Sequence, residues 1–229
     1  HQVFPITGIQ GISNIAHELL LKNFNELWIP DFEKYPGLAG KLSHGKIKMK
    51  HHYIGSLSRF SKQEKPVKYK LACILSGPEP QRNHLQDILL QQLEELDLES
   101  VVILGKTNEA YQRRHLGKIE IHNYLLGNDL NAIINESEIV VCRSGYSSLM
   151  DLTILKKKII LIPTPGQTEQ IHLAKELANQ DRAVVFDQST VNLKEALEML
   201  DHIGPIDNEG KANLFMKTVN TFLGMKTVN

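Results

Sequence analysis

The chain has 229 residues, of which 41% are hydrophobic, and its 26 basic side chains balance 26 acidic ones. The length is typical of two α/β lobes, or of one lobe with part of another. Balanced charge removes the general attraction for phosphate that nucleic-acid-binding proteins use, so we expect no nucleic-acid partner. No apolar run approaches the ~20 residues that span a bilayer, and residues 1–10 lack the pattern of a signal peptide, so we expect a cytoplasmic location.

The first 55 residues are predicted to be the end of an α/β lobe. Helical spacing of apolar residues predicts a helix over 14–24, and strands are predicted over 25–30 and 46–55. A unit of this size cannot bury its sheet on both sides, so residues 1–56 read as the end of an amino-terminal lobe whose beginning is missing. Residues 57–66 are rich in serine and charged side chains and end in proline, which is typical of a linker.

From residue 67 onward, strand and helix patterns alternate with short connections. Continuous runs of Val, Ile and Leu indicate strands that are covered on both faces, as in a parallel sheet. The sequence therefore predicts a doubly wound, Rossmann-like α/β lobe over 67–229, which includes a terminal helix. Strands are predicted over 67–75, 100–105, 118–125, 138–142, 158–164 and 183–186, and helices over 84–96, 128–137, 147–155, 168–180 and 192–200.

The two cysteines, Cys73 and Cys142, both lie inside predicted buried strands. We therefore expect both cysteines to fill space in the core as small apolar side chains, and the alternative is a disulfide or a pair of metal ligands. No Asp-x-Asp motif and no histidine cluster occurs in the sequence, so no metal and no cofactor are expected.

Three strand ends carry unusual chemistry: residues 76–82, 125–129 and 143–148. In open parallel sheets, ligands bind beyond the carboxyl ends of the strands, beside the point where strand order reverses. Glycine at such a turn permits close approach of the main chain, and a helix that starts there offers unpaired N–H groups and a partial positive charge. These features suit a diphosphate.

Asp151 lies six positions beyond Gly145, on the second turn of the predicted helix. A carboxylate there can accept hydrogen bonds from both hydroxyls of a ribose, at about 1.5–3 kcal/mol each. Ser144, Ser147 and Ser148 can cap the helix or donate to phosphate oxygen. The alternative is that these serines only cap the helix and that Asp151 is a solvated acid of its first turn.

The residues around the fourth strand of this lobe resemble a known family. The segment "VVCRSGYSSLMD" is similar to the strand and Arg-Ser-Gly-Ala-x-Thr-x-x-Glu sequence of glycosyltransferase family 28, in its carboxyl-terminal, donor-binding lobe; these are the MurG-like N-acetylglucosaminyltransferases. In this resemblance Asp151 takes the place of the ribose-binding glutamate, and Ser147 or Ser148 replaces the threonine. The segment "IILIPTPGQTEQ" is similar to the family's loop whose last glutamine meets the donor sugar, which implies Gln170 with Glu169 beside it.

Two earlier segments fit the same family. "SGPEPQR" stands in place of its glycine-rich loop, and "GSLSR" stands in place of its interdomain segment with Gly55 and Arg59. The base contact carries over to the main chain near Leu126. The donor-binding residues that the chain's chemistry and the resemblance together predict are Gly77, Arg82, Leu126, Ser144, Gly145, Ser147, Ser148, Asp151, Glu169 and Gln170.

The resemblance implies a GT-B fold, with this lobe holding a nucleotide diphosphate sugar, UDP-linked, for transfer to an acceptor hydroxyl. The acceptor is expected to be a saccharide or lipid-linked, and the resemblance also admits peripheral membrane association through the missing lobe. The family's catalytic base comes from that missing lobe, so no catalytic residue is assigned and the chain alone is expected to be inactive. Structural or surface roles are expected for His17, His51 and His52, while His1 and Gln2 could border an acceptor cleft.

Two rivals stay open. A nucleotide-sugar hydrolase or 2-epimerase shares the donor lobe of this fold. The epimerases usually have Asp-Ser-Gly-Gly where this chain has "RSGYSSLMD", which disfavours them. The second rival is a noncatalytic subunit that supplies the donor lobe to another chain.

Overall fold

The computed structural model describes residues 23–45, 47, 49–207 and 214–224. The chain divides into two compact units, one of residues 1–57 with 208–229 and the other of residues 58–207. Most of the helix expected over 14–24 lies outside the described residues, as do His1, Gln2 and His17. The sequence-based division into 1–56, 57–66 and 67–229 places the terminal helix differently, and it stays a prediction.

The smaller unit contains a two-stranded parallel sheet of β1 (Leu27–Ile29) and β2 (His51–Tyr53), the 3-10 helix η1 (Gly40–Leu42) and the helix α7 (Leu214–Phe222). The Trp28 ring lies edge-on to the rings of Phe215 and Phe222, with centroids 6.3 and 5.6 Å away. This contact joins β1 to α7 within the unit. His51 is exposed, and His52 lies 3.5 Å from Glu26.

A buried carboxylate organises the loop between β1 and β2. Asp31 Oδ1 accepts hydrogen bonds from the main-chain N–H groups of Phe32 at 2.7 Å and Leu38 at 2.8 Å. Its Oδ2 accepts from the Ala39 N–H at 3.1 Å and the Ser43 hydroxyl at 2.5 Å. These donors replace the water that the carboxylate loses on burial, which fixes the course of the loop.

The larger unit is built on a seven-stranded sheet in the order β5-β6-β4-β3-β7-β8-β9. All neighbouring strands are parallel except β5 and β6, which form an antiparallel hairpin. Strand order reverses between β3 and β7, so this is where a ligand site is expected. The strands are β3 (Tyr69–Ile74), β4 (Ser100–Ile103), β5 (Arg113–Leu116), β6 (Ile119–His122), β7 (Ser137–Cys142), β8 (Lys158–Leu161) and β9 (Val184–Val185).

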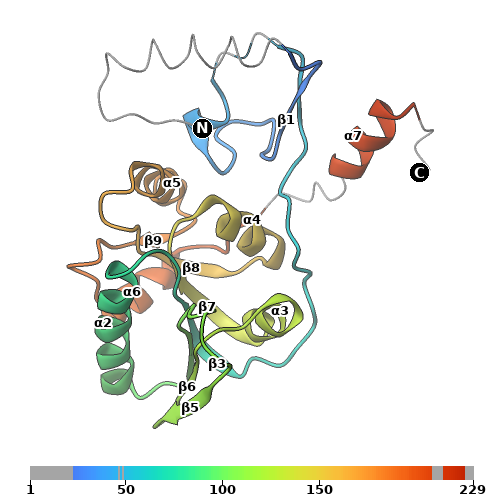
Figure 1. The fold of residues 1–229 in the computed structure, drawn as a ribbon. Coiled ribbons are helices and arrows are strands. Elements are labelled where there is room, and N and C mark those ends of the chain that lie inside the picture. The colour runs from blue at the N-terminus through green and yellow to red at the C-terminus, as the bar shows by residue number, and fades with distance from the viewer. Residues whose placement is uncertain (1–22, 46, 48, 208–213, 225–229) are drawn as a thin grey trace. The chain divides into compact units, whose positions relative to one another are not determined.

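Helices cover both faces of this sheet, with α2 and α6 on one face and α3 and α4 on the other (Figure 1). Two covered faces explain why the central strands read as continuous apolar runs. The doubly wound lobe predicted from the sequence is thus confirmed. The helices are α2 (Gln81–Leu96), α3 (Gly127–Asn135), α4 (Tyr146–Leu155), α5 (Thr168–Ala178) and α6 (Leu193–Met199), which runs into the 3-10 helix η2 (Leu200–His202).

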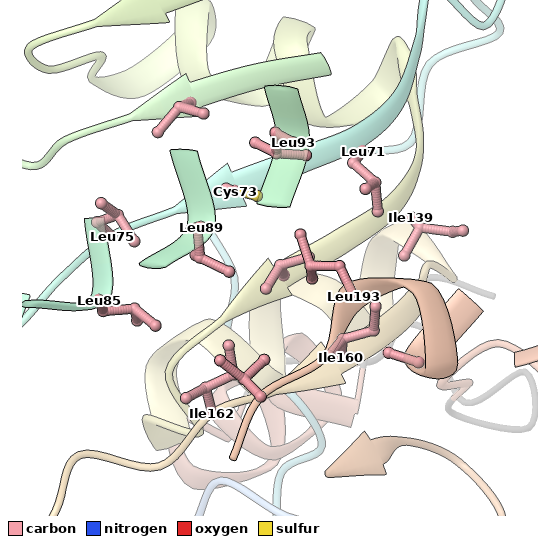
Figure 2. Close-up of a cluster of buried hydrophobic side chains, with 14 of the residues drawn as sticks. Leu71, Cys73, Leu75, Leu85, Leu89, Leu93, Ile139, Ile160, Ile162 and Leu193 are labelled. Carbon is pink, nitrogen blue, oxygen red and sulfur yellow. The ribbon is translucent and has the colours of Figure 1, made fainter. Parts of the chain in front are cut away.

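The core lies between α2 and the sheet (Figure 2). Leu85, Leu89 and Leu93 recur at every fourth position of α2, so they share one face of the helix. They pack with alternate residues of β3, among them Leu71 and Cys73, which point to the same side of the sheet. Each fully buried leucine contributes about 1.5–3 kcal/mol to stability.

The edge strand β5 was not predicted from the sequence. Its residues, Arg113 to Leu116, are mostly polar and exposed, so they lack the apolar pattern of the other strands. Pairing with β6 forms the strand despite its composition: a turn at Gly117, with φ +55°, reverses the chain and brings the two segments together. Tertiary pairing therefore outweighs intrinsic propensity here.

On the α3 side of the sheet, β6 presents a buried carboxylate, Glu120. Its Oε1 accepts a hydrogen bond from His122 Nε2 at 2.8 Å and lies 3.0 Å from Arg113 Nε. Its Oε2 accepts hydrogen bonds from the Tyr69 hydroxyl at 2.8 Å and from Lys68 Nζ at 3.2 Å. Burial alone would raise the pKa of Glu120, but the hydrogen bonds from these groups outweigh it and lower the pKa to about 2. The carboxylate is therefore ionised and saturated with donors.

This network predicts an acid-sensitive contribution to stability. The folded-state pKa of Glu120 lies below the ordinary glutamate value, so its contribution is present above the unfolded-state pKa and is lost as pH falls toward about 2. We expect Glu120→Gln to lower the free energy of unfolding at pH 7 by about 2 kcal/mol and to flatten its decline between about pH 5 and 2. Urea unfolding at several pH values, followed by circular dichroism, measures both effects.

The matched control is Glu138→Gln. Glu138 is an exposed residue of β7 paired with Lys70 at 2.7 Å, so its loss should change stability by no more than about 0.5 kcal/mol. Parallel pH profiles for the parent chain and Glu120→Gln would contradict the assignment.

Candidate functional site

The candidate site lies at the carboxyl edge of the larger sheet, where strand order reverses. Residues 75–80 connect β3 to α2 there, and residues 143–145 connect β7 to α4. Because β3 and β7 are parallel neighbours, these two loops are adjacent in space. The loop after β8, residues 162–167, lies beside them because β8 pairs with β7.

The loop after β3 depends on glycine and on an internal ion pair. Gly77 has φ +98°, a conformation that residues with a side chain rarely adopt. Arg82 donates from Nη2 to Glu79 Oε1 at 2.6 Å and from Nη1 to the Gly105 carbonyl at 2.7 Å. At Gly105 a Cβ would lie 2.5 Å from the Leu75 carbonyl oxygen, so the loops after β3 and β4 pack main chain to main chain. Arg82 thus holds both loops in place.

The loop after β7 leads into the amino end of α4. Gly145 is the N-cap residue in an extended conformation, and no side chain of the described residues caps the helix. Its first turn has no acidic residue. The hydroxyl of Ser144, a fully buried residue, donates to the Gln170 carbonyl at 2.8 Å. The amino end of α4 therefore carries its partial positive charge without a carboxylate to offset it.

Ser147 and Ser148 lie on the first turn of α4. Ser147 is exposed and Ser148 is half-buried. Neither hydroxyl makes a hydrogen bond to another described residue, and the Ser144 hydroxyl donates to Gln170. Of the two roles considered for these serines, the structure therefore contradicts the helix cap. Their hydroxyls stay available to a ligand.

Arg143 is a buried cation directly beneath this edge, with only 2% of its surface exposed. Its Nη1 donates to the carbonyls of Ile162 at 3.0 Å and Pro163 at 3.1 Å. Its Nη2 donates to the Gln81 carbonyl at 3.1 Å and to Gln188 Oε1 at 2.6 Å. Burial lowers the pKa of the guanidinium to about 10, so it stays protonated at neutral pH.

None of the hydrogen-bond partners of Arg143 in the described part of the chain is a carboxylate, and its Nε is buried without a partner. The guanidinium therefore joins the start of α2 to the loops after β8 and β9 without being neutralised. Sequence reasoning missed this role, although an arginine directly after an apolar strand is a signal that could have found it.

The loop after β8 is held by the amide side chain of Gln170. Its Oε1 accepts from the Thr164 N–H at 2.8 Å, and its Nε2 donates to Gln167 Oε1 at 2.5 Å. The Thr164 hydroxyl is buried without a partner among the described residues, and a Cβ at Gly77 would lie 3.7 Å from it. Glu169 lies in the first turn of α5 and is exposed.

Asp151 is half-buried on the second turn of α4, and its Oδ1 accepts from the Ser58 hydroxyl at 2.5 Å. Burial raises the pKa of Asp151, while the Ser58 hydroxyl and the nearby Arg59 oppose that rise. The alternative reading of a solvated first-turn acid is therefore wrong. Ser58 and Thr164 are polar residues near predicted ones that sequence reasoning did not single out.

The structure brings some of the predicted residues together and leaves others apart. Ser144 and Gln170 are hydrogen-bonded to each other, and Gly77 approaches the same loop through Thr164. Leu126 is the exposed N-cap residue of α3, after β6, which is separated from β3 by β4. Arg82 is engaged by Glu79 and Gly105.

Within the described ranges, no group of three or more His, Cys, Asp or Glu side chains is arranged to hold a metal ion. Cys73 and Cys142 are free and buried in β3 and β7, and burial raises the pKa of each thiol to about 12. Both fill the core as apolar groups. In the same described part of the chain, none of the helices is long and apolar enough to cross a membrane.

Comparison of the sequence with known proteins identifies the family of this chain. The family described as glycosyltransferase family 28 C-terminal domain matches residues 78–219, which is more than half of the chain. A curated relative from Natranaerobius thermophilus is named UDP-N-acetylglucosamine--N-acetylmuramyl-(pentapeptide) pyrophosphoryl-undecaprenol N-acetylglucosamine transferase. It is 32% identical over 103 residues, which are 44% of this chain and 26% of the relative. The chain thus spans about a quarter of that protein's length.

Two solved structures resemble the chain in fold. MurG from Acinetobacter baumannii aligns with a TM-score of 0.53 at 16% identity and covers 91% of this chain and 63% of its own. The glycotransferase of kitacinnamycin aligns with a TM-score of 0.56 at 17% identity and covers 76% of this chain and 46% of its own. The GT-B fold class expected from the sequence is confirmed by these likenesses.

The buried guanidinium of Arg143 gives a test of the site's architecture. A lysine at this position has a single ammonium that cannot reach the carbonyls on both sides, so buried acceptors are left unpaired. We expect Arg143→Lys to lower the free energy of unfolding by about 2 kcal/mol or more, measured by urea unfolding. Arg114→Lys, at an exposed position of β5, is the control and should change it by less than about 0.5 kcal/mol. Equal stability of the two variants would show that the buried bonds do not support the edge.

Proposed function

The chain belongs to glycosyltransferase family 28, and from this premise we propose that it carries the donor site of an enzyme that transfers a sugar from a nucleotide diphosphate sugar to an acceptor hydroxyl. The single observation that carries the proposal is the amino end of α4. This helix end lies where strand order reverses, and no side chain of the described residues caps it. Arg143 is buried next to it, and no carboxylate in the described part of the chain neutralises that arginine. The name of the curated relative supports uridine diphosphate as the carrier.

The diphosphate is proposed to lie against the first turn of α4. Main-chain N–H groups there and the hydroxyls of Ser147 and Ser148 donate to phosphate oxygen, while Gly77 lets the opposite loop approach closely. The helix end stabilises an anion by roughly 0.3–1 kcal/mol when exposed and by up to about 2 kcal/mol when partly buried. The charge of Arg143 adds to this field from below, because burial weakens its screening by water.

The remaining predicted residues are proposed to hold the rest of the donor. Asp151 accepts hydrogen bonds from the ribose hydroxyls, and one of these hydroxyls replaces the Ser58 hydroxyl as a donor to the carboxylate. The main chain at Leu126 contacts the base. Glu169 and Gln170 face the sugar, and Arg82 supports the loop that borders the phosphates.

The chemistry follows from this placement. As the anomeric bond breaks, negative charge builds on the departing diphosphate, and donors that are already oriented stabilise it without reorganising. A base from the amino-terminal lobe removes the proton of the acceptor hydroxyl, which attacks the anomeric carbon. The proposed acceptor is a saccharide or a lipid-linked molecule, and the proposed location is the cytoplasm. Peripheral membrane contact through the amino-terminal lobe remains part of the proposal.

A carboxylate placed at the N-cap of α4 tests the phosphate position. Gly145 has φ −72° and ψ 138°, and a Cβ there meets nothing nearer than the Ser148 hydroxyl at 4.0 Å, so both aspartate and alanine fit. Aspartate is a good N-cap and should preserve or slightly raise stability. Its charge should repel the diphosphate, so we expect Gly145→Asp to weaken UDP binding by more than about tenfold, measured by calorimetry.

Gly145→Ala is the control, because it adds a side chain without charge. A smaller loss of UDP affinity in Gly145→Ala than in Gly145→Asp supports the proposal. UDP binding that is equally strong in all three proteins would place the diphosphate elsewhere.

The ribose contact is tested with Asp151→Ala. Removing a carboxylate that accepts from ribose should weaken UDP binding by about tenfold or more, because each such bond contributes about 1.5–3 kcal/mol. Inorganic pyrophosphate has no ribose, so its affinity should stay the same in the variant. Asp87→Ala removes an exposed carboxylate from α2 and serves as the control. If Asp151→Ala binds UDP as tightly as the parent chain does, the ribose assignment is wrong.

A further inference from the structure

A separate groove of about 640 Å³ lies between α3 and the β5–β6 hairpin. On one side, Asp129, Ala132, Ile133 and Glu136 form one face of α3, because they are spaced by three or four residues. The opposite side includes Arg113 of β5 together with Glu120 and His122 of β6. Of the described residues that line the groove, none belongs to α4 or to the loops after β3, β7 and β8.

The charges along the groove nearly cancel. Lys68 and Arg113 provide two positive charges, and Glu120 and Asp129 provide two negative ones. The remaining lining acid, Glu136, is paired with a lysine outside the groove, Lys65, at 2.8 Å. A polyanion would meet the carboxylates at close range, and a cation would meet the arginine and the lysine. The balance favours an occupant without net charge.

The groove nevertheless offers hydrogen-bonding groups to an occupant. Arg113 uses Nε on Glu120 at 3.0 Å, and its two Nη groups make no hydrogen bond to another described residue. The Asp129 carboxylate likewise has no side-chain partner among the described residues. Donors on one wall and an acceptor on the other suit a molecule with several hydroxyl groups.

Aromatic rings among the lining residues provide an apolar surface that is already fixed in place. The Tyr111 side chain is 51% exposed, yet its hydroxyl is hydrogen-bonded to His122 Nδ1 at 2.9 Å. Its ring stands edge-on to the Tyr124 ring, with centroids 6.0 Å apart. His122 is buried and held on its other side by Glu120 at 2.8 Å. The Tyr111 side chain therefore loses little conformational entropy when a ligand packs on its ring.

We propose that this groove is a saccharide-binding site, distinct from the donor diphosphate site. A sugar ring carries no charge, has hydroxyls around its edge for Arg113 and Asp129, and has a C–H face that packs on the Tyr111 ring. The volume lies within the range of about 300–1,000 Å³ that is usual for small-molecule sites and fits one or two sugar units. The inference does not depend on the donor assignment. Leu126 is the one lining residue that is also proposed to meet the donor, through its main chain at the base, and Tyr111, Arg113 and Asp129 lie outside the proposed donor site.

The test is a saturation-transfer NMR titration of the chain with N-acetylglucosamine, N,N′-diacetylchitobiose and maltose, each with and without saturating UDP. We expect at least one of these sugars to bind, and to bind equally with UDP present. Tyr111→Ala should weaken that binding by about tenfold, because the ring contact is lost. Arg113→Gln should weaken it too, through the loss of the Nη donors.

Matched controls separate the groove from general effects. Tyr35→Ala removes another exposed tyrosine, 55% exposed, from the smaller unit, and Arg114→Gln changes the neighbouring arginine, whose side chain points to the other side of β5. Both should leave sugar binding unchanged, and circular dichroism with thermal unfolding checks that every variant folds.

Several outcomes would overturn the proposal. One is the absence of binding by all three sugars, and another is full binding in both Tyr111→Ala and Arg113→Gln. Displacement of the sugar by UDP would mean that it sits in the donor site. Displacement by inorganic phosphate would make the groove an anion site. Failure of the donor proposal is seen separately, in the UDP titrations of Gly145→Asp and Asp151→Ala.

Discussion

The carboxyl edge of the larger sheet depends on the buried guanidinium of Arg143. Its hydrogen bonds reach the carbonyls of Gln81, Ile162 and Pro163, so one side chain fixes the start of α2 and the loop after β8. Burying a charge is costly unless its hydrogen bonds are satisfied, and here carbonyls and an amide satisfy them rather than a carboxylate. The positive charge is therefore retained beneath the surface where the diphosphate is proposed to bind, and the loops that would hold the phosphates owe their shape to the same group.

Two buried charges of the larger unit, Glu120 and Arg143, have opposite kinds of surroundings. Glu120 is surrounded by two cationic side chains and two further donors, so its charge is neutralised locally and the groove above it is nearly neutral. Arg143 has only neutral acceptors, so its field extends to the end of α4. One sheet can thus carry both the proposed anion site at its carboxyl edge and the proposed hydroxyl-binding groove beside α3. The difference comes from which partners surround each charge and needs no difference in fold.

The sequence predicted most of the larger lobe, because apolar runs identify buried strands and helical spacing identifies α2, α4 and α5. It could not predict the strand order, since that depends on pairing between distant segments. The polar strand β5 was missed for the same reason: its partner forms it. In the site, the positions of Ser144, Gly145 and Asp151 relative to α4 followed from spacing alone. The bond of Asp151 to Ser58 did not, because it joins residues 93 positions apart.

The outer edge of β5 closes one end of the sheet and pairs with no other strand in the described part of the chain. Open strand edges can recruit the edges of other molecules and so begin aggregation. Here the edge carries Arg113, Arg114 and His115, all exposed. Two such edges that met side by side would bring like charges together before main-chain hydrogen bonds could form. The polar composition that made β5 hard to predict from the sequence therefore also protects the edge against pairing with another molecule.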